Sequence, residues 1–169
     1  MGGAALPDKS LVVMDPQRGL LADVFPCEDG HAQERALLDA VPATVQAGEL
    51  WLADRNFCTR GFLRGLHERG AHGLLRLHGG LPFAQVTAWG TVGETKDGQR
   101  IKEQAIEVEG RRYRCIRVEL AEPTRDGDAF VDLVTDLPER VDAVTVAALY
   151  RKRGALETAF QHLEKHFES

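Results

Sequence analysis

The sequence predicts a single α/β domain in which a β-rich block interrupts a mixed α/β region. Three observations predict it: a β-α-β order around residues 50–78, alternating apolar residues from about 79 to 137, and a helical pattern after Pro138. The chain has 169 residues, 43% of them apolar, which suffices for one well-packed core.

The first elements are a hairpin and a helix. Two short apolar runs, Leu11 to Met14 and Leu20 to Phe25, flank a segment that contains the turn formers Pro16 and Gly19. This pattern predicts a β-hairpin. Apolar residues then recur at helical spacing, which predicts a helix from about 31 to 46.

The β-α-β unit follows this helix. Residues 50–53 are apolar on both faces of the predicted strand, as in a central strand covered by helices, and Asp54 comes directly after them. Thr59 is a suitable cap for a helix that ends near Gly70. A second strand is expected from His72 to His78.

The β-rich block spans about 79–137. Lys96-Asp97-Gly98 and Glu109-Gly110 are turn signals between its strands, and the run from Phe130 to Val134 predicts its last strand. The final helix shows one apolar stripe, made of Leu156, Phe160, Leu163 and Phe167. No capping residue precedes Ser169, so we expect the natural helix or protein to continue.

Charge and cysteine content restrict the function. A net charge of -5 excludes nonspecific coating of nucleic acid, so any contact with DNA needs a local basic patch. We expect a cytoplasmic protein without a membrane partner, because the sequence shows neither a leader nor a membrane-length apolar run. The three cysteines, Cys27, Cys58 and Cys115, are widely spaced and are expected to be packed thiols.

Two carboxylates are the candidate reactive groups. Tyr150, Arg153 and Glu157 lie in one row of the last helix, and a helix packed on the sheet can bring Glu157 opposite Asp54. Such a pair suits Mg²⁺, a hard ion that binds one or two carboxylates together with phosphate oxygens. The alternative is structural: Asp54 would then be a capping or turn residue, and Glu157 would pair with Arg153 on the helix surface.

A basic cluster accompanies these carboxylates in the sequence. Its members are Arg151, Lys152, Arg153, Arg55, Arg60 and Arg64. They could contact a DNA backbone near the carboxylates, or they could form an ordinary solvated face. Trp51 is expected in the core, whereas the sequence leaves Trp89 open between packing and DNA contact.

At the Asp54 segment and the Tyr150 helix, the sequence resembles the DDE transposases of bacterial insertion sequences, in the group with a Tyr-Arg-Glu-Lys signature helix. The resemblance implies a ribonuclease H-like fold with a β-rich insertion. It also implies DNA as partner and two Mg²⁺ (or Mn²⁺) ions. Asp54 and Glu157 would be catalytic metal ligands, and Arg55, Tyr150 and Arg153 would position DNA phosphates.

Two departures from the family pattern concern the site. Position 164, where the signature expects Lys, is Glu164, and Lys165 is turned by about 100° from the expected DNA-contacting place. The family's first catalytic Asp ends a strand ahead of the hairpin, and that strand has no counterpart here. Asp15 stands in a hairpin turn, which explains it without catalysis.

The sequence therefore predicts a partial transposase catalytic domain over 1–169 that lacks its first strand and is inactive alone. In complete form it would cleave and transfer DNA at insertion-sequence ends, and a second copy of the chain is a candidate partner. One alternative is a non-catalytic DNA-binding or interaction remnant. Another is a small α/β protein without a nucleic-acid role.

Overall fold

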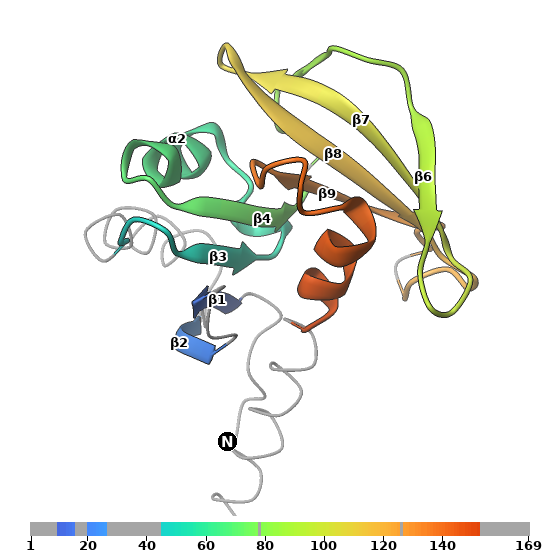
Figure 1. Ribbon diagram of the computed structural model, residues 1–169, viewed down its shortest axis with the longest axis horizontal. Coiled ribbons are helices and arrows are strands. Elements are labelled where there is room, and N and C mark those ends of the chain that lie inside the picture. The colour runs from blue at the N-terminus through green and yellow to red at the C-terminus, as the bar shows by residue number, and fades with distance from the viewer. Residues whose placement is uncertain (1–9, 16–19, 27–44, 78, 126, 153–169) are drawn as a thin grey trace, which may run out of the picture.

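The computed structural model describes residues 10–15, 20–26, 45–77, 79–125 and 127–152. Within these ranges the chain forms one mixed nine-stranded sheet with helical segments on both faces (Figure 1). The strands are β1 (Ser10–Asp15), β2 (Leu20–Pro26), β3 (Leu50–Ala53), β4 (His72–Arg76), β5 (Ala84–Gln85), β6 (Gly90–Glu94), β7 (Arg100–Val108), β8 (Arg111–Glu119) and β9 (Phe130–Thr135). Their order is β2-β1-β3-β4-β9-β8-β7-β5, and β6 also pairs with β7.

The expected hairpin is confirmed, because β1 and β2 pair antiparallel. β1 also pairs antiparallel with β3, so β3 lies between β1 and β4 in the sheet. β2 pairs with the other side of β1 and is the outermost strand of the sheet there. The helix expected over 31–46 lies mostly outside the described residues, and Val45 and Gln46 at its predicted end are not helical.

The β-α-β prediction is also confirmed. β3 and β4 run parallel and are joined by a three-residue 3-10 turn, η2 (Arg55–Phe57), and by α2 (Arg60–Glu68). Thr59 caps α2, since its Oγ1 accepts a hydrogen bond from the backbone N–H of Phe62 at 3.1 Å. Strand β4 ends at Arg76, two residues earlier than the sequence predicts.

The β-rich block supplies β5 to β9, and its main feature is the long β7–β8 hairpin. The turn of this hairpin has positive φ angles at both Glu109 (50°) and Gly110 (78°), which is typical of tight turns that match the twist of the strands. The hairpin extends diagonally past β9, and its turn approaches α2 (Figure 1). An ion pair of 3.2 Å between Arg64 of α2 and Glu109 joins the two.

The core consists of two clusters on the two faces of the sheet. Trp51 and Ala53 pack with α2, whereas Leu50 and Leu52 pack with the helical residues 143–152. All four residues of β3 are buried, as expected for a strand covered on both faces. Among the described helices, none is long and apolar enough to span a membrane.

Candidate active site

The site is built around Asp54, which follows directly after the carboxyl end of β3. The strand stops there because η2 begins: the backbone N–H of Phe57 donates to the carbonyl of Asp54 at 3.2 Å. Phe57 is fully buried and contacts the ring of Phe62 in α2, which fixes the turn against the core. Asp54 is 8% exposed and is the one buried carboxylate among the described residues.

A cleft of about 390 Å³ opens beside this turn. Its walls are Arg55, Arg76, Leu77, Gly79, Asp128, Phe130 and Asp132. Arg76 is paired with Asp128 at 2.9 Å, whereas Arg55 is exposed and makes no ion pair within the described part of the chain. Arg55 is therefore an exposed cation in the cleft wall, and its predicted contact with DNA phosphates stays a prediction.

The far wall of the cleft is held by Arg117. Its guanidinium donates two hydrogen bonds to the Asp132 carboxylate, at 2.8 and 2.9 Å, and this bidentate pairing keeps the pKa of Arg117 raised. The same guanidinium lies 4.4 Å from the Trp89 ring centroid and 3.8 Å from that of Phe130. One side of Trp89 is thus occupied by an intramolecular contact, which answers the question that the sequence left open in favour of packing.

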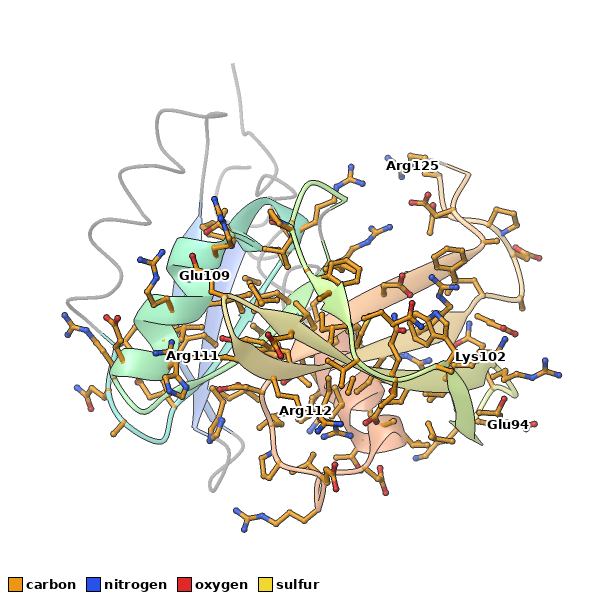
Figure 2. The ribbon with its side chains drawn as sticks, turned by 90° about the horizontal axis from the view of Figure 1, so that it is seen from above. Glu94, Lys102, Glu109, Arg111, Arg112 and Arg125 are labelled. Carbon is orange, nitrogen blue, oxygen red and sulfur yellow. The ribbon has the colours of Figure 1, made fainter. Side chains whose placement is uncertain are left out.

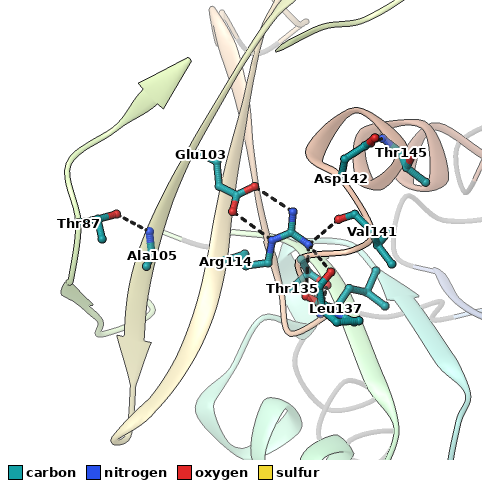
Figure 3. A network of polar contacts seen from close by, with 10 residues as sticks. Thr87, Glu103, Ala105, Arg114, Thr135, Leu137, Val141, Asp142 and Thr145 are labelled. Atoms are coloured by element: carbon teal, nitrogen blue, oxygen red, sulfur yellow. Dashed lines mark hydrogen bonds and ion pairs between the residues drawn. The ribbon is translucent and has the colours of Figure 1, made fainter. Parts of the chain in front are cut away.

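The last helix is attached to the sheet through Arg114, which is largely buried (Figure 3). Arg114 donates to both Glu103 oxygens, at 3.1 and 2.9 Å, and to the carbonyls of Leu137, Pro138 and Val141. These carbonyls belong to the loop that leads into the helix. Asp142 then caps the helix by accepting from the backbone N–H of Thr145 at 2.7 Å, a bond that lowers the pKa of Asp142.

Tyr150 lies on this helix and packs against the second core cluster, together with Leu50 and Leu52 of β3. The structure thus places the helical residues 143–152 against β3, the strand that Asp54 follows. Glu157, Arg153 and Lys165 lie outside the described residues, so the predicted pairing of Asp54 with Glu157 stays a prediction.

Strand register separates Asp15 from Asp54. In the antiparallel pair β1–β3, Leu11 is opposite Ala53 and Met14 is opposite Leu50. Asp15 therefore lies beyond the amino end of β3, about five residues or ~16 Å from the level of Asp54. Asp15 is the last residue of β1, opposite Leu20, and does not lie in the turn as the sequence predicts. Its distance from Asp54 excludes it as a third carboxylate beside Asp54.

The predicted basic cluster is only partly retained. Arg64 pairs with Glu109, and Arg151 pairs with Asp97 at 3.3 Å, so both cations are engaged within the protein. Arg60 and Arg55 remain exposed next to the Asp54 turn. The patch that could meet a phosphate backbone is therefore smaller than the sequence indicates.

The described residues contain no group of three or more His, Cys, Asp or Glu side chains that could hold a metal ion. The two acids in the cleft, Asp128 and Asp132, are bound to arginines. Asp54 has the chemistry of a hard-ion ligand, since carboxylate oxygens are the groups that such ions prefer.

The geometry defines a mixed α/β domain with a buried carboxylate at a strand end, beside an arginine-lined cleft. In a comparison with known families, the model of the transposase DDE domain family matches residues 9–169. The chain belongs to the transposase DDE domain family. No curated protein and no solved structure matches it.

Sequence reasoning missed the polar pairs of the β-rich block. Arg117 and Asp132 are direct partners in the β8–β9 register, and Glu103 and Arg114 lie on neighbouring strands. Each of these residues reads as an ordinary exposed strand residue in the sequence. Only the register, which the sequence does not state, brings the opposite charges together.

Proposed function

We propose that residues 1–169 are part of the catalytic domain of an insertion-sequence DDE transposase, ribonuclease H-like in fold, with a β-rich insertion at about 79–137. The complete enzyme would cleave and transfer DNA strands in the cytoplasm. The observation that carries this proposal is the buried Asp54 at the end of β3, beside a cleft that exposes Arg55, in a chain of the DDE domain family.

In this proposal Asp54 and Glu157 hold Mg²⁺ or Mn²⁺. A helix continued beyond residue 152 would carry Glu157 seven positions past Tyr150, about 10 Å further along the same side. Bound divalent ions supply charge stabilisation for an in-line displacement at phosphorus. The protein's own residues orient the DNA: Arg55 and Arg153 grip phosphates, and Tyr150 and Lys165 contact the same strand.

The isolated chain is incomplete in this proposal, because the family's first catalytic Asp has no counterpart. Asp15 cannot replace it, since the β1–β3 register places Asp15 at the opposite edge of the sheet. This observation also favours the second candidate function, a non-catalytic DNA-binding or interaction remnant that acts with another copy of the chain. The first candidate and the DNA-binding form of the second require DNA binding at the Arg55 cleft, and only the first requires a bound metal.

The test of DNA binding is a salt titration of binding to a 20-base-pair duplex. The variant Arg55→Ala/Arg153→Ala should lower the slope of log K against log salt by roughly 1.8, since each phosphate contact contributes about 0.9. The control Lys96→Ala/Arg140→Ala removes the same charge from two exposed sites outside the cleft and should leave the slope unchanged. An equal slope in the wild type and the cleft variant would contradict the proposal.

A further inference from the structure

A second groove, of about 450 Å³, lies at the edge of the sheet where β4 begins and β9 ends. It is lined by His67, Gly70, Ala71, His72, Arg111, Arg112, Tyr113 and Asp136. Because His72 and Arg76 are the two ends of β4, the groove is separated from the Arg55 cleft by the length of that strand, about 13 Å. It is therefore a separate site, at the other end of β4 from the Arg55 cleft.

The groove carries positive charge that the protein does not neutralise. Among the described residues, neither Arg111 nor Arg112 has a carboxylate within ion-pairing distance, whereas the other arginines of β7 and β8, which are Arg100, Arg114 and Arg117, each do. The nearby Glu109 is taken by Arg64 at 3.2 Å. Figure 2 shows Arg111 and Arg112 at the end of the β7–β8 hairpin that reaches α2.

The one carboxylate in the groove is turned to the protein. Asp136 accepts a hydrogen bond from the backbone N–H of Gly73 at 3.0 Å and lies 3.4 Å from Nδ1 of His72. Nδ1 of His72 is buried, so the exposed part of that ring is its other edge. The Asp136 carboxylate thus bonds to the backbone of β4 and forms no ion pair with Arg111 or Arg112 within the described part of the chain.

Tyr113 supplies a neutral donor at the base of the groove. Its side chain is 5% exposed and lines the groove. Burial, followed by the charge of Asp136, raises the pKa of Tyr113, so the phenol keeps its proton. A protonated phenol in a groove wall can donate a hydrogen bond to a ligand oxygen.

We propose that this groove binds phosphate groups, and that their source is the backbone of a nucleic acid. Arg111 and Arg112 provide charge, Tyr113 donates to a phosphate oxygen, and His67 and His72 donate from the α2 side. Arg111 and Arg112 stand at successive positions at the start of β8 and both line the groove, and two such cations suit successive phosphates of a strand better than one small ion. The choice of nucleic acid rests on the proposed function, whereas the phosphate chemistry does not.

The experiment compares the wild type with two groove variants in the same duplex salt titration. Arg111→Ala/Arg112→Ala should lower the slope by roughly 1.8 for two lost phosphate contacts. Tyr113→Phe removes only the hydroxyl and should weaken duplex binding about tenfold at constant slope. The control Lys96→Ala/Arg125→Ala removes the same charge as the double variant; Figure 2 shows Arg125 at the other end of the molecule from Arg111.

A second arm distinguishes the two sources of phosphate. Inorganic phosphate is titrated into ¹⁵N-labelled wild type and Tyr113→Phe, and circular dichroism confirms the fold of every variant. If phosphate shifts the amides around Tyr113 while the groove variants bind duplex normally, a free ion is the ligand and the backbone assignment is overturned. No response to either probe, or an equal slope change in the control, overturns the site altogether.

The outcome is separable from that of the proposed function. Loss of slope in Arg111→Ala/Arg112→Ala, with Arg55→Ala/Arg153→Ala unchanged, would support the groove and contradict the Arg55 cleft as the DNA site. The reverse result would support the cleft and overturn the groove.

Discussion

Asp54 shows how far a single position can be interpreted from sequence. The apolar run of residues 50–53 followed by a polar triplet places Asp54 at a strand end, and the structure has it there, 8% exposed. The sequence could not indicate which residues line the adjacent cleft, because they come from separate elements. Arg76 belongs to β4, Asp128 to the loop before β9, and Asp132 to β9. Their positions depend on strand register and not on local propensity.

The cysteines provide a prediction about the reactivity of a single side chain. Cys58 and Cys115 are buried free thiols, as the sequence predicts for packed cysteines. Burial, and secondarily the charge of Asp132, raises the pKa of Cys115 from 9.0 to about 12. At pH 8 Cys115 should therefore resist a thiol reagent in the folded protein and react once the protein is unfolded, as peptide mass mapping would show. Rapid labelling of folded Cys115 would contradict its assigned environment.

The raised pKa also affects stability. The folded state holds the Cys115 proton more tightly than the unfolded state, so this stabilisation is complete below pH 9 and is lost as the pH rises toward 12. Cys115→Ala should therefore lose less of its unfolding free energy than the wild type between pH 8 and pH 10.5. Urea unfolding at both pH values measures the difference, and parallel losses in the two proteins would refute it.

At the scale of elements, the local signals were informative. Thr59 as a cap, Gly70 as a helix end and Glu109-Gly110 as a hairpin turn are confirmed, because each depends on the conformations of neighbouring residues. The attachment of the last helix could not be predicted in this way. It depends on Arg114, whose partners come from β7 and from a loop more than twenty residues later in the chain.

Arg114 gives the prediction for this attachment. Arg114→Met should lower the free energy of unfolding by about 2–4 kcal/mol, because it leaves Glu103 and three carbonyls without their donor. The matched control is Arg100→Ala, whose exposed pair with Glu119 spans 4.0 Å; its effect should stay within about 0.5 kcal/mol. Chemical denaturation measures both, and equal effects would show that Arg114 is not the attachment point.

For the whole molecule, the sequence predicts an α/β domain with a β-rich insertion, and the described residues form one continuous mixed sheet. The sequence did not indicate where the first hairpin joins this sheet. β1 pairs directly with β3, and β2 is the outer strand. Hydrophobic periodicity predicts strands but does not determine which distant strands pair with one another.

This topology predicts that the isolated chain neither nicks nor joins DNA. A two-metal site needs a bridging carboxylate between its ions, and the register keeps Asp15 at the wrong edge of the sheet. The assay is incubation of purified protein with a supercoiled plasmid and with a linear DNA end in Mg²⁺ or Mn²⁺. Metal-dependent cleavage that disappears in Asp54→Ala would overturn the prediction and require another residue as the third carboxylate.

We propose that Asp54 and Glu157, 103 positions apart in sequence, share a divalent metal ion. Electron paramagnetic resonance titration of Mn²⁺ tests it most directly in the wild type, Asp54→Asn, Glu157→Gln and the control Asp15→Asn, with circular dichroism to confirm folding. We predict one weak site that is lost in Asp54→Asn and in Glu157→Gln and is kept in Asp15→Asn. If Glu157→Gln binds Mn²⁺ as the wild type does, or if Asp15→Asn loses the binding, Asp54 and Glu157 do not share the metal ion.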